Sequence, residues 1–193
     1  PVRHAYDTEA ATRLLAEAGY PEGKGLDTIV LYYNTDDSHQ RVAQQIQQDL
    51  AAIGIRIELR NEDWGSYLEH VEGSDTVNTD ISFYRMGWIA DYPDPDNFMS
   101  VRLSCKMFGP RGNYDRYCNT EFQALIEEAR LKTDMAERIP LYRRAEQIAV
   151  DDAVWLFIYY YGEEALVKPY VKGFPLSPQG DYTAPLNEVR FEP

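Results

Sequence analysis

The feature that most constrains this chain is an abrupt change of character near position 90. An apolar and aromatic run that begins near Ile81 is typical of a buried strand. The run leads directly into a turn of acids and prolines, Asp91, Pro93, Asp94, Pro95 and Asp96. Because proline cannot donate a hydrogen bond to a sheet, we expect the strand to end by about Tyr92. Asp91 would then lie at the carboxyl end of a strand, where open α/β sheets bind ligands.

A purely local role is the alternative for Asp91, Asp94 and Asp96. They could cap turns and open a helix at Asp96 or Asn97. A hydrolase that uses two of the three as a carboxylate pair is a further alternative, but acids so close together on one turn seldom face each other across a substrate. The acids also match a calcium loop poorly, because the turn has two prolines and lacks a glycine. We therefore favour a binding role for this turn.

The first half of the chain is typical of alternating helices and strands. A helical pattern covers residues 7–19, and a strand pattern covers residues 26–34. Ser38 opens a second helix that ends at Gly54, after which residues 55–60 alternate as in a half-exposed strand. This order predicts a βαβ-like unit in an α/β sheet.

The second half contains two further helix signals and one very apolar run. Asn119 or Thr120 is placed to cap one helix and Asp134 another, in which Pro140 should mark a kink or the first turn. Residues 153–161 are too apolar to face water on either side. They predict a central or cleft-lining strand.

These segments together resemble a known family. The run over residues 87–98, Gly-Trp-Ile-Ala-Asp-Tyr-Pro-Asp-Pro-Asp-Asn-Phe, closely resembles the C-terminal lobe of family 5 extracytoplasmic solute-binding proteins, the peptide-binding and nickel-binding components of ABC importers. The resemblance covers nearly the whole chain in the right order, through Leu14-Leu15-Ala16-Glu17-Ala18-Gly19-Tyr20, Gly54-Ile55, Trp64, Asn119 with Phe122, and Leu166-Val167-Lys168-Pro169-Tyr170-Val171. It implies an α/β fold, a periplasmic binding protein type II-like lobe with a mixed sheet flanked by helices.

The resemblance also implies that the chain is one part of a larger protein. Such binding proteins have two lobes, and 193 residues are too few for both. Residues 1–174 would form the C-terminal ligand-binding lobe, and residues 175–193 a terminal tail that crosses over toward the missing N-terminal lobe. Without that lobe the tail could be disordered, fold back locally, or pair with a neighbouring chain through an exposed edge. One lobe presents half a site, so we expect it to bind peptide weakly or not at all.

The family resemblance suggests five ligand-binding residues. In similar peptide-binding proteins, an aspartate that matches Asp91 receives the ligand's α-ammonium group, and an arginine that matches Arg85 lies close enough to meet a ligand carboxylate. Trp64 and Trp88 match residues that wall the ligand, with Tyr92 beside them, although isolated tryptophans are more often simply core. We expect an oligopeptide as cargo. An oligosaccharide, a nickel chelate or another solute is the alternative within the family.

Location and partners are implied in the same way. The resemblance implies an extracytoplasmic protein, in the periplasm or as a membrane-anchored lipoprotein, whose closed state is recognised by an ABC transporter permease. No cofactor or metal is expected, since His4, His39 and His70 are not paired at metal spacing and solvated or capping roles suit them. No enzyme is expected, since no Gly-x-Ser-x-Gly elbow is present. With 32 acidic and 19 basic side chains, the net charge of -13 argues against nucleic acid as a partner.

Cys105 and Cys118 are the two cysteines of the chain. In an exported protein they are candidates for a disulfide, which would stabilise the fold by roughly 3 kcal/mol by restricting the unfolded chain. Two free thiols are the alternative.

Overall fold

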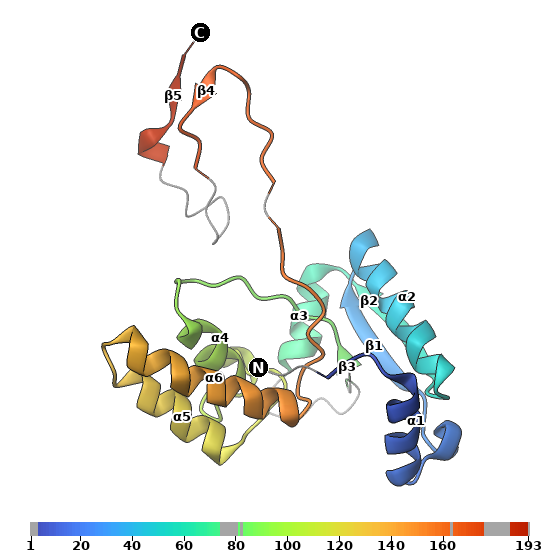
Figure 1. Ribbon diagram of the computed structural model, residues 1–193. Helices are drawn as coiled ribbons and strands as arrows, with labels where there is room; N and C mark the ends of the chain where they lie inside the picture. Colours follow the sequence, from blue (N-terminus) through green and yellow to red (C-terminus); the bar gives the residue numbers. More distant parts are fainter. Residues whose placement is uncertain (1–3, 74–80, 82, 163, 176–185, 193) are drawn as a thin grey trace.

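The computed structural model describes residues 4–73, 81, 83–162, 164–175 and 186–192 (Figure 1). Its α-helices are α1 (Thr8–Glu17), α2 (Asp37–Ala52), α3 (Trp64–Glu72), α4 (Pro95–Leu103), α5 (Thr120–Arg130) and α6 (Met135–Asp151). Its strands are β1 (Ile29–Asn34), β2 (Ile57–Glu62), β3 (Phe83–Tyr84), β4 (Val171–Lys172) and β5 (Arg190–Phe191). Across these ranges, none of the helices combines the length and the hydrophobicity that a membrane span requires.

The main sheet is parallel, with β1 in its centre and the order β2-β1-β3. Leu31 of β1 pairs with Leu59 of β2 and with Phe83 of β3. Successive side chains of a strand face opposite sides of the sheet, so Leu31 packs with α2 and Tyr32 packs with Tyr67 of α3. The sequence β1-α2-β2 is therefore the predicted βαβ unit, with helices on both faces of the sheet (Figure 1).

Short polar side chains fix the starts of most helices. Asn119 caps α5 and Asp134 caps α6, as the sequence predicts, and Asp63 caps α3. The cap of α2 is Asp36, whose carboxylate accepts the backbone N–H of Ser38 at 2.8 Å. Ser38 therefore lies inside the first turn of α2 and does not open it.

The helices α4, α5 and α6 form a second core beside the sheet. Phe122 and Ile126 of α5 pack against Tyr142 and Ala145 of α6, and all four are buried. Pro140 lies inside α6, which begins at Met135, so of the two alternatives for Pro140, a kink or the first turn, the first turn is wrong.

The loop between α4 and α5 is held by covalent and polar bonds. Cys105 and Cys118 are joined by a disulfide. Asn113 is fully buried in this loop, and its amide nitrogen donates to the backbone oxygens of Ser104 at 2.9 Å and Tyr117 at 2.8 Å. These bonds give a fixed conformation to a loop whose regular structure is limited to the short 3-10 helix Gly109–Arg111.

The strand predicted to lead up to Asp91 is much shorter in the structure. Tyr84, the last residue of β3, pairs with Tyr32, and the backbone N–H of Arg85 still donates to the Tyr32 oxygen at 2.8 Å. Beyond this point β1 itself ends at Asn34, so the chain loses its pairing partner. Asp91 therefore follows a segment without regular secondary structure rather than the end of a strand, which corrects the expectation from the prolines.

The apolar run 153–161 also forms no strand, contrary to the prediction. Leu156 is 63% exposed and Tyr160 is 81% exposed. Burial of such a run requires a layer on each side, and no described strand pairs with it.

An arm follows this run and carries the end of the chain away from the body (Figure 1). Its described residues are 164–175 and 186–192. Its strands β4 and β5 pair antiparallel, with Val171 opposite Phe191. Much of the tail predicted for residues 175–193 lies outside the described residues, but Phe191 and Tyr170 of the arm are exposed and contact each other at 6.3 Å between ring centroids.

Candidate functional site

Arg85 follows β3 directly and lies buried, with 8% of its surface exposed. Its guanidinium donates to the hydroxyls of Tyr159, at 2.9 Å, and Tyr161. Its backbone oxygen accepts the hydroxyl of Tyr67 in α3. Both of these side-chain hydrogen-bond partners are neutral, and no ion pair joins the guanidinium to a described carboxylate. Burial lowers the pKa of Arg85, but the bonds to both tyrosines outweigh this and leave the pKa raised.

Asp91 and Trp88 come together through a third side chain, Asn97. The indole N–H of Trp88 donates to Asn97 Oδ1 at 2.7 Å, and the backbone N–H of Asp91 donates to the same oxygen at 3.2 Å. The amide nitrogen of Asn97 donates to Asp91 Oδ2 at 3.0 Å. The Asp91 carboxylate is otherwise exposed, so it is available to a ligand.

A buried cation lies over the ring of Trp88. The guanidinium of Arg102 lies 5.2 Å from the centroid of the Trp88 ring and 4.2 Å from that of Tyr114. Arg102 is almost fully buried and also donates to the backbone oxygen of Gly112. A cation over an indole face is attracted by its quadrupole, so this contact fixes the ring plane of Trp88.

The remaining acids of the turn are used inside the fold. Asp94 caps α4 through the N–H of Asp96 and forms a two-bond ion pair with Arg138 at 2.6 and 2.9 Å. Asp96 accepts the hydroxyls of Ser100 at 2.5 Å and Tyr92 at 2.8 Å. Burial raises the pKa of Asp96, but these hydroxyls, the charge of Arg130 and the Tyr142 hydroxyl together lower it by more, so the net pKa lies below its usual range. The helix thus begins at Pro95, not at Asp96 or Asn97.

Trp64 and Tyr92 lie at the edges of this arrangement. Trp64 begins α3, is 52% exposed and stacks on Tyr67 with 6.0 Å between ring centroids. Because Tyr67 also bonds to Arg85, these two rings connect Trp64 to the arginine. Tyr92 is exposed, and burial together with its bond to Asp96 raises the pKa of its hydroxyl.

The structure adds His39 and Asn34, which the sequence did not suggest for the site. Asn34 ends β1 and His39 lies in the first turn of α2, at the edge of the sheet where Arg85 follows β3. Asn34 Oδ1 and His39 Nδ1 are buried without a hydrogen-bond partner among the described residues. Burial and the nearby charge of Arg85 lower the pKa of His39. One ring nitrogen of His39 is therefore buried rather than solvated, and the position of His39 after β1 is the signal that could have indicated its place near the site.

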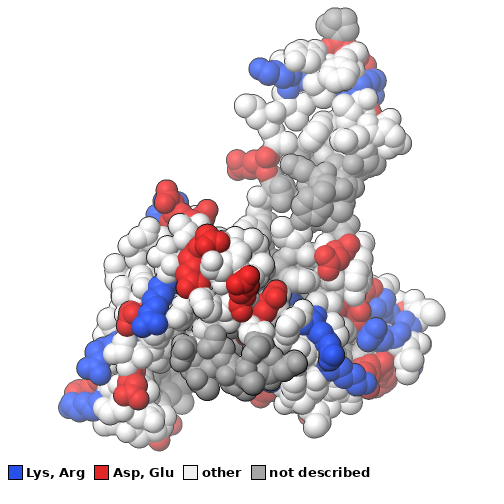
Figure 2. Space-filling model, turned by 180° about the vertical axis from the view of Figure 1, so that it is seen from behind, with Lys and Arg blue, Asp and Glu red and all other residues white. Residues whose placement is uncertain are grey.

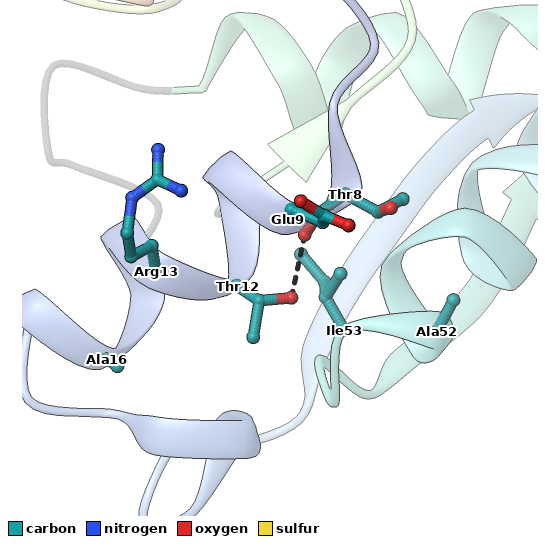
Figure 3. Close-up of a pocket in the computed structure, with 7 residues that line it drawn as sticks. All are labelled: Thr8, Glu9, Thr12, Arg13, Ala16, Ala52 and Ile53. Atoms are coloured by element: carbon teal, nitrogen blue, oxygen red, sulfur yellow. Dashed lines mark hydrogen bonds between the residues drawn. The ribbon is translucent and has the colours of Figure 1, made fainter.

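The structure has two surface pockets that are not lined by the predicted ligand residues. A pocket of about 490 Å³ lies between α1 and the end of α2, where the Thr12 hydroxyl donates to the Thr8 oxygen at 2.7 Å (Figure 3). A second pocket of about 300 Å³ is lined by residues such as Tyr84, Tyr114 and Asp115.

Neither the distribution of surface charge nor a cluster of metal ligands marks the candidate site. On the face seen in Figure 2, acidic and basic side chains are interspersed over the body of the molecule. Within the described ranges, no group of three His, Cys, Asp or Glu side chains is placed to hold a metal ion.

Comparison with known proteins places this geometry in context. Residues 1–109 match the family described as bacterial extracellular solute-binding proteins, family 5 Middle. The chain is 31% identical over 181 residues to the dipeptide-binding protein of Escherichia coli (strain K12), covering 93% of this chain and 33% of that protein. It is 35% identical over 180 residues to heme-binding protein A of Haemophilus influenzae, covering 92% of this chain and 32% of that protein.

A solved structure shows the same fold. The OppA of Haemophilus influenzae, crystallised in complex with the peptide RPPGFSPFR, superposes with a TM-score of 0.76 at 29% identity. The match covers 95% of this chain and 34% of that one. The α/β fold is that of a type II periplasmic binding protein, as the sequence predicts, and the chain spans about a third of the length of the relatives it matches.

Proposed function

This chain belongs to family 5 of the bacterial extracellular solute-binding proteins, and we propose that it forms the C-terminal ligand-binding lobe of a two-lobed protein that binds oligopeptides for an ABC importer. Relatives named for dipeptide binding, and a relative crystallised with a peptide, support this cargo. The observation that carries the proposal is the exposed Asp91 carboxylate, held beside Trp88 by Asn97.

Asp91 would receive the α-ammonium group of the peptide. A carboxylate and an ammonium attract each other far more strongly in a closed, partly dehydrated cleft than in water. Arg85 would receive a ligand carboxylate, because its present partners are neutral hydroxyls and a charged acceptor forms a stronger hydrogen bond. Trp88, Trp64 and Tyr92 would offer aromatic faces, which accept varied side chains.

The second lobe would complete the site by closing over the ligand. In this proposal residues 1–174 form the ligand-binding lobe, and residues 175–193 cross toward the other lobe. The exposed apolar side chains of the run 153–161 and of the arm support this arrangement, because they offer surface that another lobe could cover. The closed form would be the state that the permease recognises.

The same reasoning gives a location and argues against catalysis. We place the protein outside the cytoplasm, free in the periplasm or anchored as a lipoprotein, and we assign it no cofactor.

Catalysis is not proposed for this chain. The family consists of binding proteins, and Asp94 and Asp96 are both engaged within the fold, which leaves no free carboxylate pair with Asp91. Recovery of unchanged ligand, with no hydrolysis products, would support this assignment.

Another solute is the second candidate. Heme-binding protein A is as similar to this chain as the dipeptide-binding protein is, so the framework carries different cargoes. By the same argument, the same framework would accommodate an oligosaccharide or a nickel chelate.

Native mass spectrometry of the full-length protein, purified gently and then denatured, tests the proposal. We expect a mixture of short peptides, which is lost in Asp91→Ala. Recovery of a sugar, a heme or a metal chelate would overturn the peptide assignment. Peptide binding that is indifferent to Asp91 would overturn the site. The isolated lobe should bind trialanine weakly or not at all, and micromolar or tighter binding would contradict the two-lobed mechanism.

A further inference from the structure

We propose that Asn97 is a positioning residue that holds the Asp91 carboxylate and the Trp88 indole in one fixed arrangement for the ligand's ammonium group. The inference rests on the proposed peptide-binding function. It assigns to Asn97 a role beyond the start of α4, the only role that its sequence position suggested.

The side-chain amide of Asn97 makes three hydrogen bonds to these two residues. Its Oδ1 accepts from the Trp88 indole N–H at 2.7 Å and from the Asp91 backbone N–H at 3.2 Å. Its Nδ2 donates to Asp91 Oδ2 at 3.0 Å. The amide therefore holds both ends of Asp91, its backbone and its carboxylate, and ties them to the indole.

Burial makes this arrangement specific. Asn97 is 0% exposed, so water cannot replace any bond that its amide loses. A reversed amide would place the NH2 group against two N–H donors, which fixes the orientation that the hydrogen bonds require. The bond to Oδ2 also limits rotation of the Asp91 carboxylate, whose other oxygen makes no hydrogen bond to the described residues.

The start of α4 does not require the Asn97 side chain. Asp94 is the cap of this helix, and it accepts the backbone N–H of Asp96 at 2.9 Å. Asp94 is also held by Arg138, so the first turn is fixed independently. Meanwhile Arg102 supports the ring face of Trp88, so Asn97 is left to set the position of its N–H edge.

Asn113 provides a matched control. Like Asn97 it is fully buried and forms three hydrogen bonds, to Ser104, to the Tyr117 oxygen and from the Tyr117 N–H. Those bonds lie in the loop between α4 and α5 and do not reach Asp91 or Trp88. The substitution Asn113→Ala therefore reports the loss of stability caused by removing a buried asparagine side chain that does not contact Asp91 or Trp88.

The experiment compares Asn97→Ala, Asn97→Leu and Asn113→Ala in the full-length protein, with trialanine and N-acetyl-trialanine as probes. Asn97→Leu fills the volume that alanine leaves empty, so a binding defect shared by both variants does not come from a cavity. Fluorotryptophan NMR, with the Trp88 signal assigned by Trp88→Phe, reports the indole position. Urea unfolding identifies the conditions in which each variant is folded.

We expect both Asn97 variants to shift the Trp88 signal and to lose about tenfold or more in affinity for trialanine, whereas Asn113→Ala keeps both. Asp91→Ala and Asn97→Ala together should lose little more than Asp91→Ala alone, because the two residues act through one contact. N-acetyl-trialanine should show little difference between the proteins, since it lacks the ammonium group.

Two other results separate the possible failures. If the wild type binds trialanine through Asp91 but the folded Asn97 variants bind as well as Asn113→Ala, the positioning role is wrong and the proposed function stands. If the wild type does not bind trialanine, or Asp91→Ala binds it equally well, the proposed function fails and this inference fails with it.

Discussion

The guanidinium of Arg85 donates a hydrogen bond to the hydroxyl of Tyr159 at 2.9 Å, between residues far apart in the sequence. This bond and its counterpart to Tyr161 fasten the exposed run 153–161 to the edge of the sheet. Tyr159→Phe removes one acceptor from a buried charge. Because the tyrosine ring is itself half exposed, we expect the free energy of unfolding to fall by about 1 kcal/mol, measured by urea denaturation.

Tyr6→Phe is the control for this change. Tyr6 is 77% exposed, and its bond to Asp49 is long, at 3.4 Å. Its loss should therefore change stability by less than about 0.5 kcal/mol. Equal effects of the two substitutions would mean that the Arg85 bond contributes nothing specific.

Gly54 and the turn at Glu22 and Gly23 approach too closely for a side chain. Gly54 has φ +92°, and a Cβ placed there would lie 2.2 Å from the backbone oxygen of Glu22. Gly25 has a similar φ of +85° but open space around it. Gly25→Ala should cost about 1 kcal/mol from backbone strain alone, and Gly54→Ala about 2 kcal/mol more, because rigid backbone must move. Thermal and urea unfolding of both variants measure the difference, and equal costs would contradict the close packing.

The disulfide between Cys105 and Cys118 closes a short loop, and the two residues are 13 positions apart. Its reduction should raise the intact mass by two hydrogens and lower the free energy of unfolding by about 3 kcal/mol, since the unfolded chain gains freedom. Cys105→Ser with Cys118→Ser should match the reduced protein. A mass that does not change on reduction would show that the thiols are free.

The parts of the fold that could be predicted are those determined by neighbours in sequence. Asn119 and Asp134 cap helices because their side chains reach N–H groups two or three residues ahead, and the alternation predicted for residues 55–60 follows from strand geometry. The run 153–161 was mispredicted for the opposite reason. Its burial depends on partner layers elsewhere, and a sequence pattern cannot show whether such layers are present.

The candidate site could likewise be predicted only in part. The turn of acids indicated where the site lies, but not that Asp94 is paired with Arg138 while Asp91 remains exposed. The sequence positions of Asn97 and His39 do not indicate the contacts that their side chains make. Their roles depend on contacts made only after folding, such as the approach of His39 to Arg85.

The position of His39 predicts how stability depends on pH. Burial, and then the charge of Arg85, lower the pKa of His39 in the folded state below the value of about 6.5 in the unfolded chain. As the pH falls through 6.5, the unfolded state therefore binds a proton that the folded state does not, and stability declines until the folded pKa is reached. His39→Gln removes this proton, so its free energy of unfolding should decline less steeply than that of the wild type as the pH falls below about 6.5. Urea unfolding across this range, referenced to pH 8 where the imidazole is neutral in both states, measures the two slopes. Parallel curves would show that His39 titrates normally and is not buried beside Arg85.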